Sequence, residues 1–462
     1  MKGGTGVDGG SDGKGGSDGK LGVTASSALL IGGMFGSAIF SLSGLTIVIA
    51  GPSAILSWAI AGAVLFLYGF ITAELSVTYP NSGGVFVFPA KTLGRTPEAG
   101  KLFGWISCWA YIFGCFGGAA FSAAYVGIYL GVAFPSMDAL RVPLSLAAIA
   151  LCGLLNVFGV RVAGRASAMM AGGLIVAMLV FIMGGLFGGS WEGANLVPFF
   201  TQGEGGPFGF MSAVPLAMVA FSAIVTVAFM VGEIRDPKKT VPKAMTIAMF
   251  VVGATYLLII LATLGLVTSA YLSQTGMQYI PLFAAAYRSL ESLPWLPYLV
   301  SLAAVLALTN NILVLTTLLS RTIQVTAASG ILPRGLSTLT RAGAPLRATL
   351  AVAAVLAVLS SIPDATNFII GMGTLCSAIV VAMICLSVLA ARKKEPGIRS
   401  FRAPGGNALP VVIMAVITAC YVPDIIKGGW RLWACTLGYF AAGLAIYQIG
   451  ARRAKKTGGA IK

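Results

Sequence analysis

Long apolar segments alternate with short polar ones along almost the whole chain. A helix that crosses the hydrocarbon core of a bilayer needs about 20 mostly apolar residues, and about twelve such segments recur. The pattern therefore predicts an all-α integral membrane protein with about 12 transmembrane helices. The predicted spans lie near residues 22–49, 54–78, 102–134, 143–159, 167–188, 211–231, 245–270, 296–327, 347–362, 366–391, 408–426 and 430–450.

The two ends of the chain are polar. Residues 1–21 are mostly Gly, Ser, Asp and Lys, and the hexapeptide Gly-Gly-Ser-Asp-Gly-Lys occurs twice within residues 9–20. Such a segment buries too little apolar surface to fold alone, so we expect a disordered cytoplasmic tail and no signal peptide. Residues 22–450 form the expected transmembrane domain, and residues 451–462 form a basic cytoplasmic tail.

The composition excludes a soluble protein. Hydrophobic residues make up 57% of the chain and charged residues 10%, with a mean hydropathy of +0.92, whereas soluble domains carry about 25% charged residues. Histidine is absent, and the seven cysteines form no CxxC pair. We therefore expect no enzyme, no catalytic residue, no metal site and no bound cofactor.

The net charge of +16 follows the expected topology. With both termini in the cytoplasm, only four of the 30 lysines and arginines fall in outer segments: Arg141, Arg288, Lys427 and Arg431. This asymmetry obeys the positive-inside rule. The sequence thus predicts a multi-pass protein of the cytoplasmic membrane that contacts the lipid bilayer and binds no nucleic acid, and it favours no particular oligomeric state.

Glycines interrupt the centre of the first span. Residues 29–40 read Leu-Leu-Ile-Gly-Gly-Met-Phe-Gly-Ser-Ala-Ile-Phe. Each glycine weakens a helix by roughly 1 kcal/mol against alanine, and a helix broken inside a bilayer lines a cavity. The break would expose N–H groups for an anion and carbonyls for an ammonium, so one site would hold both ends of a zwitterion. The alternative is a continuous helix with a Gly-rich packing face.

The sixth span carries a weaker signal for a second break. Its centre has the small-residue step Ser222-Ala223 but no glycine. The alternative is an unbroken helix in which Ser222 and Thr226 bond to their own backbone.

Four short motifs are spread along the chain in a fixed order. They are Gly32-Gly33-Met34-Phe35-Gly36-Ser37-Ala38-Ile39-Phe40, then Ala73-Glu74-Leu75-Ser76 with Tyr79-Pro80-Asn81-Ser82-Gly83-Gly84, then Gly232-Glu233-Ile234-Arg235-Asp236-Pro237, and finally Phe401-Arg402-Ala403-Pro404-Gly405-Gly406. Together they resemble motifs of the amino acid–polyamine–organocation (APC) superfamily, in its amino-acid permease branch. The resemblance covers residues 22–450.

The resemblance implies a LeuT-type fold, which is a 5+5 inverted repeat followed by two C-terminal helices. Spans 1–5 would occupy residues 22–188, spans 6–10 residues 211–391, and spans 11–12 residues 408–450. It also implies a secondary active transporter, a symporter or an exchanger, that moves an amino acid by alternating access. The substrate would lie between broken helices 1 and 6.

The resemblance further implies the site residues. The substrate carboxylate would bind backbone N–H groups of Gly36 and Ser37 and the Ser37 hydroxyl. The ammonium would bind carbonyls of Met34 and of either Val219 or Ser222. The other expected substrate-binding residues complete the break or line the side-chain pocket, and they are Gly33, Ala38, Ala220, Phe221, Ala223 and Ile224.

Departures from the family pattern narrow the expected substrate. Ala38 stands where the family has a second glycine, and small or aliphatic residues fill positions 223–225, which predicts a small apolar pocket. No charge lies at the middle of a span, which favours a neutral, small or apolar amino acid. A polyamine or alkylamine transporter and a non-transporting ligand receptor are the alternatives. The fifth span lacks the lysine that proton-coupled relatives often carry, so coupling to H+, coupling to Na+ and simple exchange all remain open.

Polar residues outside the break are candidates for gating or coupling. Glu74 is expected to pair with the loop of Lys91 and Arg95 or with Arg235, or else to cap its span. In the eighth span, side-chain oxygens near the Gly32 and Gly33 carbonyls are expected to form a cation site or to bond between helices. They belong to Asn310, Asn311, Thr316 and Thr317.

Overall fold

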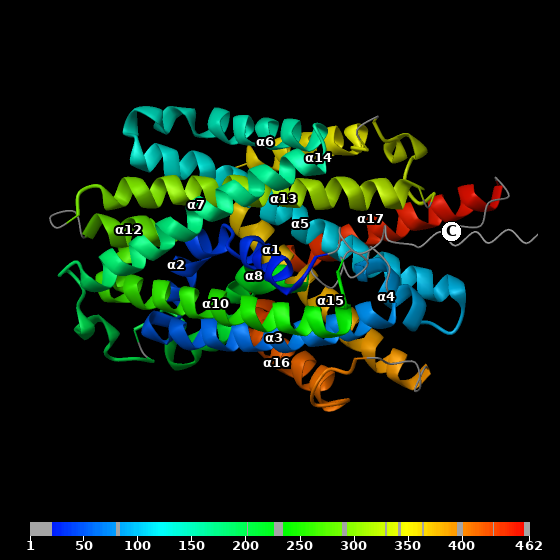
Figure 1. Cartoon of the computed structure of the whole chain (residues 1–462), viewed down its shortest axis with the longest axis horizontal. Helices are drawn as coiled ribbons and strands as arrows, with labels where there is room; N and C mark the ends of the chain where they lie inside the picture. The colour runs from blue at the N-terminus through cyan, green and yellow to red at the C-terminus, as the bar shows by residue number, and fades with distance from the viewer. Residues whose placement is uncertain are drawn as a thin grey trace, which may run out of the picture.

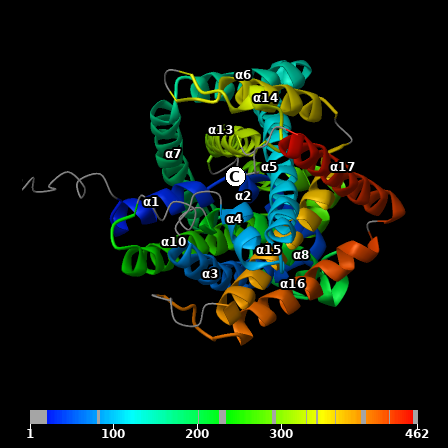
Figure 2. The same cartoon turned by 90° about the vertical axis from the view of Figure 1, so that its right-hand side faces the viewer.

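The structure is a computed structural model that describes residues 21–79, 84–200, 202–225, 234–288, 293–328, 330–340, 343–362, 365–394, 401–427 and 429–456. Over these residues it is helical, and the one extended feature is an isolated bridge between Leu21 and Ile234. Long helices run side by side along the longest axis (Figure 1), and Figure 2 views the same bundle from one end.

The helices of the first half follow the predicted spans. They are α1 (Val23–Met34), α2 (Ala38–Ala50), η1 (Gly51–Ser53), α3 (Ala54–Thr78), α4 (Gly84–Thr92), α5 (Pro97–Ala133), η2 (Pro135–Leu140), α6 (Arg141–Val157) and α7 (Val160–Phe187). Local chemistry sets the start of α5. Thr96 accepts the N–H of Ala99 at 3.3 Å, and Pro97 fills the first helical position, where no backbone donor is needed.

The second half begins with two three-ten turns, and its helices again follow the spans. Its elements are η3 (Gly193–Leu196), η4 (Gly206–Phe208), α8 (Gly209–Phe221), η5 (Ser222–Val225), α10 (Pro237–Leu266), α11 (Ser269–Thr275), η7 (Met277–Tyr279), α12 (Pro281–Arg288), α13 (Leu296–Ala328), η8 (Arg334–Ser337), α14 (Leu346–Ser360), α15 (Ala365–Lys394), α16 (Ala408–Lys427) and α17 (Gly429–Lys456). Pro237 starts α10 as Pro97 starts α5.

Among the described residues, nine helical segments are long and apolar enough to cross a membrane. One of them, Ala38–Thr78, joins α2 to α3. Shorter apolar helices occur at Val23–Met34, Leu346–Ser360 and Ala408–Tyr421. Each of the twelve predicted spans therefore contains a helix. The all-helical architecture is confirmed, while the count of twelve spans stays a prediction.

Contacts between helices recur in matched pairs across the two halves. Helix α1 packs on α10 as α8 packs on α3, and α7 packs on α13 as α15 packs on α5. Other contacts join corresponding members of the two halves directly, as in α5 with α13 and α6 with α14. In both views α6 and α14 lie together at one edge of the bundle (Figures 1 and 2). If spans 1–5 correspond in order to spans 6–10, each contact named here between one helix of each half has a counterpart between the two corresponding helices.

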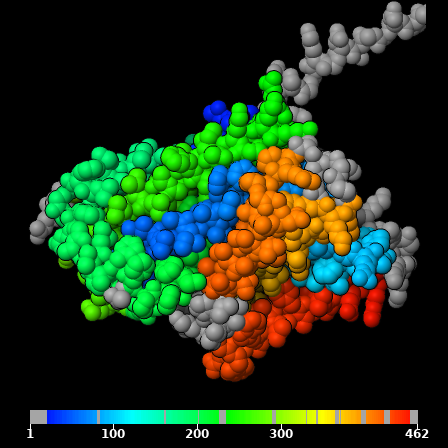
Figure 3. Space-filling view, turned by 90° about the horizontal axis from the view of Figure 1, so that it is seen from below, coloured from blue at the N-terminus to red at the C-terminus, as the bar shows by residue number. Residues whose placement is uncertain are grey.

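The outward surface is apolar. Large side chains such as Phe187, Phe250 and Trp430 are about three-quarters exposed, and Figure 3 shows a face to which α3, α16 and α17 contribute. In water such a surface would favour association. It suits a bilayer, where lipid tails cover it and backbone groups stay paired inside helices.

Candidate functional site

The first span is broken at its centre. Helix α1 ends at Met34, α2 begins at Ala38, and the N–H of Gly36 donates to the Met34 carbonyl at 2.6 Å. With φ −66° and ψ 78°, Phe35 has the geometry of an inverse γ-turn. The continuous helix that was the alternative is therefore excluded. The break lies away from both ends of the bundle (Figure 1).

Backbone groups on both sides of the break lack backbone partners. Within the described chain, the N–H groups of Ser37, Ala38 and Ile39 donate to no backbone carbonyl. The carbonyls of Gly32 and Gly33 accept none of the N–H groups beyond the break. Helix termini expose such groups, and the positive end of the α2 dipole adds to the attraction for an anion. The break thus presents donors on one side and acceptors on the other.

The Met34 carbonyl is already occupied. It accepts the N–H of Gly36 and the hydroxyl of Tyr256 on α10. A carbonyl oxygen has two lone pairs, so both are engaged. The Met34 carbonyl, expected to bind the ammonium, thus has no lone pair left over, whereas the carbonyls of Gly32 and Gly33 accept no N–H group from beyond the break. Tyr256 lies more than 200 residues from the break in sequence, and no local signal indicated this contact.

An aromatic cluster holds the apolar side of the break. Phe35, Trp58, Phe221 and Tyr256 meet edge to face, with ring centroids 5.3 to 6.1 Å apart. All four are fully buried, and edge-to-face pairs add roughly 0.5–1.5 kcal/mol beyond burial. Trp58 also donates to Thr46 on α2 at 3.0 Å. Phe221 therefore packs inside this cluster.

The sixth span changes from an α-helix to a three-ten turn at the predicted step. Helix α8 ends at Phe221, and η5 covers Ser222–Val225. The Ser222 hydroxyl donates to the Val219 carbonyl at 2.8 Å, so the back-bonding considered for Ser222 occurs. Thr226 and Glu233 lie outside the described residues, and so does the second half of this span.

The break in the first span meets the three-ten turn of the sixth span. A Cβ built on Gly33 would lie 3.5 Å from the Cβ of Ala223. Around this contact, Gly33, Val219 and Ser222 are exposed, and Gly36 and Ala223 are half-buried. By contrast, Ala220 and Ile224 are buried, and Ile224 approaches Gly69 of α3. Among the expected α8 and η5 residues, the accessible ones are Val219, Ser222 and Ala223.

A cluster of three polar side chains, the Ser37–Ser122–Asn311 cluster, joins the break to α5 and α13. Asn311 Nδ2 lies 3.1 Å from Ser37 Oγ and 2.8 Å from Ser122 Oγ. Ser122 Oγ lies 3.0 Å from Ser37 Oγ and 2.8 Å from the Gly118 carbonyl. Ser37 and Asn311 were expected site residues. Ser122, in the run Ala-Phe-Ser-Ala-Ala, was missed because nothing in that sequence marks it.

The other polar residues of α13 do not join this cluster. Thr317 donates to Asn156 of α6 and to the Leu313 carbonyl. Asn310 Oδ1 and Thr316 Oγ1 are buried without a hydrogen-bond partner among the described residues. Because Asn311 and Thr317 point to different helices, the four side chains do not converge on a single cation site.

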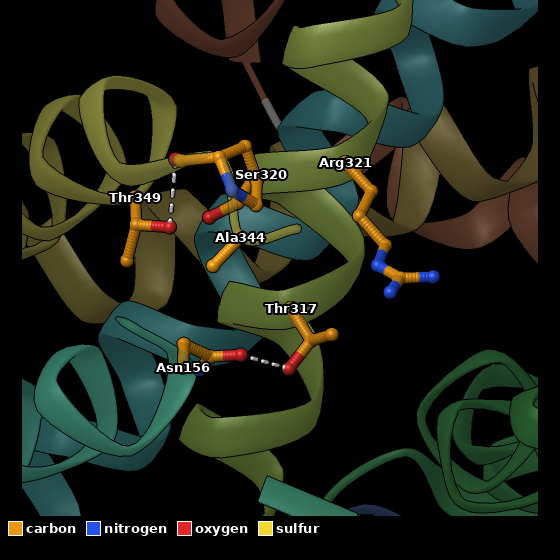
Figure 4. Close-up of a pocket in the computed structure, with 7 residues that line it drawn as sticks. Asn156, Thr317, Ser320, Arg321, Ala344 and Thr349 are labelled. Atoms are coloured by element: carbon orange, nitrogen blue, oxygen red, sulfur yellow. Dashed lines mark hydrogen bonds between the residues drawn. The ribbon is translucent and has the colours of Figure 1, made fainter. Parts of the chain in front are cut away.

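A small polar hollow lies beside Thr317 (Figure 4). Its volume is about 10 Å³, roughly the room that one water molecule needs. Its lining includes Asn156, Ser320, Arg321 and Thr349. The hollow does not include the break, so it is separate from the candidate substrate site.

Glu74 belongs to a buried ion pair. Its two carboxylate oxygens accept Nε and Nη2 of Arg392 at 2.9 and 2.6 Å, and Oε2 also accepts the N–H of Ala403 at 2.9 Å. The side chains are 2% and 7% exposed. The observed partner is thus Arg392 at the end of α15, and not the predicted Arg235 or 91–95 loop. The pairing joins the second motif, at Glu74, to the fourth motif, at Ala403.

Arg235 lies at another junction. Its N–H donates to the Leu21 carbonyl at 3.0 Å, and its own carbonyl accepts the hydroxyl of Thr240. With the Leu21–Ile234 bridge, this contact ties the start of α1 to the segment that follows the sixth span.

A helical membrane protein whose first span is broken, and whose break meets a three-ten turn of another span at accessible polar groups, has the features of the class of membrane transport proteins. The sequence profile of the amino acid permease family matches residues 21–444. The chain belongs to this family, as its motifs indicated, and so to the APC superfamily.

Relatives of similar length agree with this assignment. An uncharacterized transporter of Mycobacterium tuberculosis is 26% identical over 442 residues, which cover 95% of this chain and 93% of the relative. The branched-chain amino acid permease BcaP of Bacillus subtilis is 25% identical over 455 residues, with 94% of each chain covered. The serine/threonine exchanger SteT of the same organism is 24% identical over 255 residues, covering 54% of this chain and 55% of its own.

Proposed function

We propose that this amino acid transporter carries a neutral, small or apolar amino acid by secondary active transport with alternating access. The observation that supports this most is that backbone groups on both sides of the break lack backbone partners across it. The donors are the N–H groups of Ser37, Ala38 and Ile39, and the acceptors are the carbonyls of Gly32 and Gly33. A zwitterion matches both sets at once. The site would include Gly33, Gly36, Ser37, Ala38, Val219, Ser222 and Ala223.

A neutral substrate fits the surroundings of the break. The side chains described around it are aromatic, aliphatic, hydroxyl or amide groups. A second positive charge on a polyamine, or a charged side chain, would need a buried counter-charge to offset its desolvation. The relatives named for branched-chain and for hydroxyl amino acids fall within the neutral class.

A LeuT-type inverted repeat would account for the matched helix contacts. Under the exchange of spans 1–5 with spans 6–10, the contact of α1 with α10 becomes that of α8 with α3. Alternating access would then rock one group of helices against another around the break. The buried Glu74–Arg392 pair, at the expected cytoplasmic end, would hold α3 and α15 together. We propose that both termini lie in the cytoplasm.

Uptake into proteoliposomes tests the function. Proteoliposomes that contain the purified protein and are loaded with unlabelled L-leucine or L-serine should accumulate the same labelled amino acid by counterflow. A receptor that binds without moving its ligand would show binding and no counterflow. Inhibition by putrescine at concentrations that match the amino acid would instead indicate polyamine transport.

The coupling mode is tested in the same vesicles. Stimulation by an imposed proton gradient that a protonophore abolishes would identify H+ symport, and stimulation by a Na+ gradient would identify Na+ symport. Uptake that depends only on amino acid inside the vesicle would identify exchange.

A further inference from the structure

The Ser37–Ser122–Asn311 cluster has one hydrogen-bond acceptor left over. Asn311 Nδ2 carries two hydrogens, and the two serine oxygens at 3.1 and 2.8 Å take both. The amide plane is therefore fixed from two sides, by Ser37 at the break and by Ser122 on α5. Asn311 Oδ1 lies on the opposite side of that amide, and no described residue donates a hydrogen bond to it.

Asn311 Oδ1 lies next to the open part of the break. It is 3.9 Å from the position that a Cβ on Gly36 would take, and Asn311 is half-buried, in contrast to the buried Asn310. The absence of a side chain at Gly36 leaves this space free. A small group placed there would contact Asn311 Oδ1, the Gly36 backbone and the start of α2.

The Ser37 hydroxyl can also serve as a donor. The single hydroxyl hydrogen of Ser122 has two acceptors within reach, the Gly118 carbonyl at 2.8 Å and Ser37 Oγ at 3.0 Å. When it points to Ser37, the Ser37 oxygen accepts from both Ser122 and Asn311, and its own O–H hydrogen can turn to another acceptor. The Ser37 hydroxyl and the free N–H groups of α2 can thus bind a carboxylate while Asn311 Oδ1 accepts from a donor beside it. The α-ammonium is the donor that every α-amino acid carries next to its carboxylate.

We propose that Asn311 is a substrate-binding residue whose Oδ1 accepts a hydrogen bond from the α-ammonium of the substrate, and that Ser122 is the positioning residue that orients its amide. The proposal rests on the proposed function and names a further contact in the same site. It gives the ammonium a side-chain acceptor on α13 in place of the Met34 carbonyl, which Tyr256 occupies. A neutral amide oxygen suits a zwitterion, because it adds no net charge to the site.

The test compares each amino acid with the acid that lacks its ammonium. Binding of L-leucine and 4-methylpentanoate, and of L-serine and 3-hydroxypropanoate, is measured on purified protein by calorimetry. Asn311→Ala should weaken binding of each amino acid about tenfold or more, since hydrogen bonds to charged groups are the strong ones, while binding of the deaminated acids changes less than about twofold. Ser122→Ala should reduce the same preference to a smaller extent.

Asn310→Ala is the matched control, because it removes the neighbouring amide from the same helix. It should leave the preference for the amino acid over its deaminated acid unchanged. If Asn311→Ala weakens binding of the amino acid and of its deaminated acid equally, the role of Asn311 is merely structural and the proposal is overturned. Unchanged binding of both ligands would overturn it as well. A wild-type protein that binds neither amino acid would overturn the proposed function and this contact with it.

A second variant covers the case in which Asn311→Ala does not fold. Asn311→Asp keeps the size of the side chain, and it replaces the amide donor that faces the two serines with an oxygen to which their hydroxyls can donate. It also adds a negative charge beside the ammonium position. Affinity for 3-methylbutylamine, which is leucine without its carboxylate, should rise relative to L-leucine by about tenfold. An unchanged ratio of the two affinities would contradict the placement of the ammonium beside Asn311.

Discussion

Two polar clusters inside this protein have opposite hydrogen-bond balance. In the Glu74–Arg392 pair, both carboxylate oxygens accept from Arg392, and Ala403 adds a backbone donor. In the Ser37–Ser122–Asn311 cluster, the Asn311 Oδ1 acceptor remains unused beside backbone groups that lack backbone partners. The first cluster leaves its carboxylate no need of a ligand, whereas the second has the capacity to bind one.

Structural and ligand-binding polar groups of a membrane protein differ in whether all of their hydrogen bonds are made. Both kinds are costly to bury. A cluster whose oxygens are all paired stabilises the contact between its helices. A cluster with unpaired groups next to accessible backbone is stable only if water or substrate completes it.

Arg392→Ala should cause the largest loss of stability. Removing one partner of a buried ion pair leaves the other charge uncompensated and costs about 3–5 kcal/mol. The apparent melting temperature of the protein in detergent should fall strongly. The melting temperature of Arg392→Lys should lie between those of the wild type and of Arg392→Ala, because an ammonium keeps the charge but cannot form the two parallel hydrogen bonds of a guanidinium. Arg321→Ala, which removes an exposed arginine, is the control. A melting temperature equal to that of the control would refute a structural role for the pair.

Gly36→Val should abolish uptake while the protein still folds. A Cβ at Gly36 meets its nearest atoms, the Met34 carbonyl oxygen and Asn311 Oδ1, at 3.7 and 3.9 Å. The protein therefore tolerates a side chain there, but the side chain fills the space assigned to the substrate. Affinity should fall at least about a hundredfold. Gly172→Val, at an open position on α7, is the matched control, and equal uptake by the two variants would show that the site lies elsewhere.

Ser37→Ala should weaken binding about tenfold or more. The change removes a hydroxyl donor for the carboxylate and an acceptor for Asn311, while the N–H groups of α2 remain. The loss should be larger for L-leucine than for 3-methylbutylamine, which has no carboxylate. Direct binding measurements on both ligands check this, and an equal loss for the two would argue against a carboxylate at Ser37.

Tyr256→Phe should have the smallest effect, on stability more than on binding. The ring stays in the aromatic cluster, and the Met34 carbonyl keeps the N–H of Gly36. Loss of one neutral hydrogen bond costs about 1 kcal/mol. Thermal stability and uptake should both remain close to wild type. A loss of uptake comparable to that of Gly36→Val would mean that Tyr256 acts on the substrate directly.

The sequence was sufficient for the helices, and it marked the place of the break while leaving a continuous helix as the alternative, because both signals depend on local composition. Apolar length predicted each span, and Gly32, Gly33 and Gly36 predicted where the first span opens. Partners distant in the chain could not be read in this way. Arg392 meets Glu74 across 318 positions, Tyr256 meets Met34 across 222, and Ser122 looks like any serine in a run of small residues.

The bond between Leu21 and Arg235 has a practical consequence for anyone who attaches a reporter to this protein. The first α-helix starts two residues after Leu21, whose carbonyl is held by the segment next to the sixth span. A fluorescent protein fused directly before residue 21 would lie beside this junction between the first span and the segment that follows the sixth. A label placed beyond α17 would avoid that junction, and comparing uptake by the two fusions would show how firmly the junction must hold.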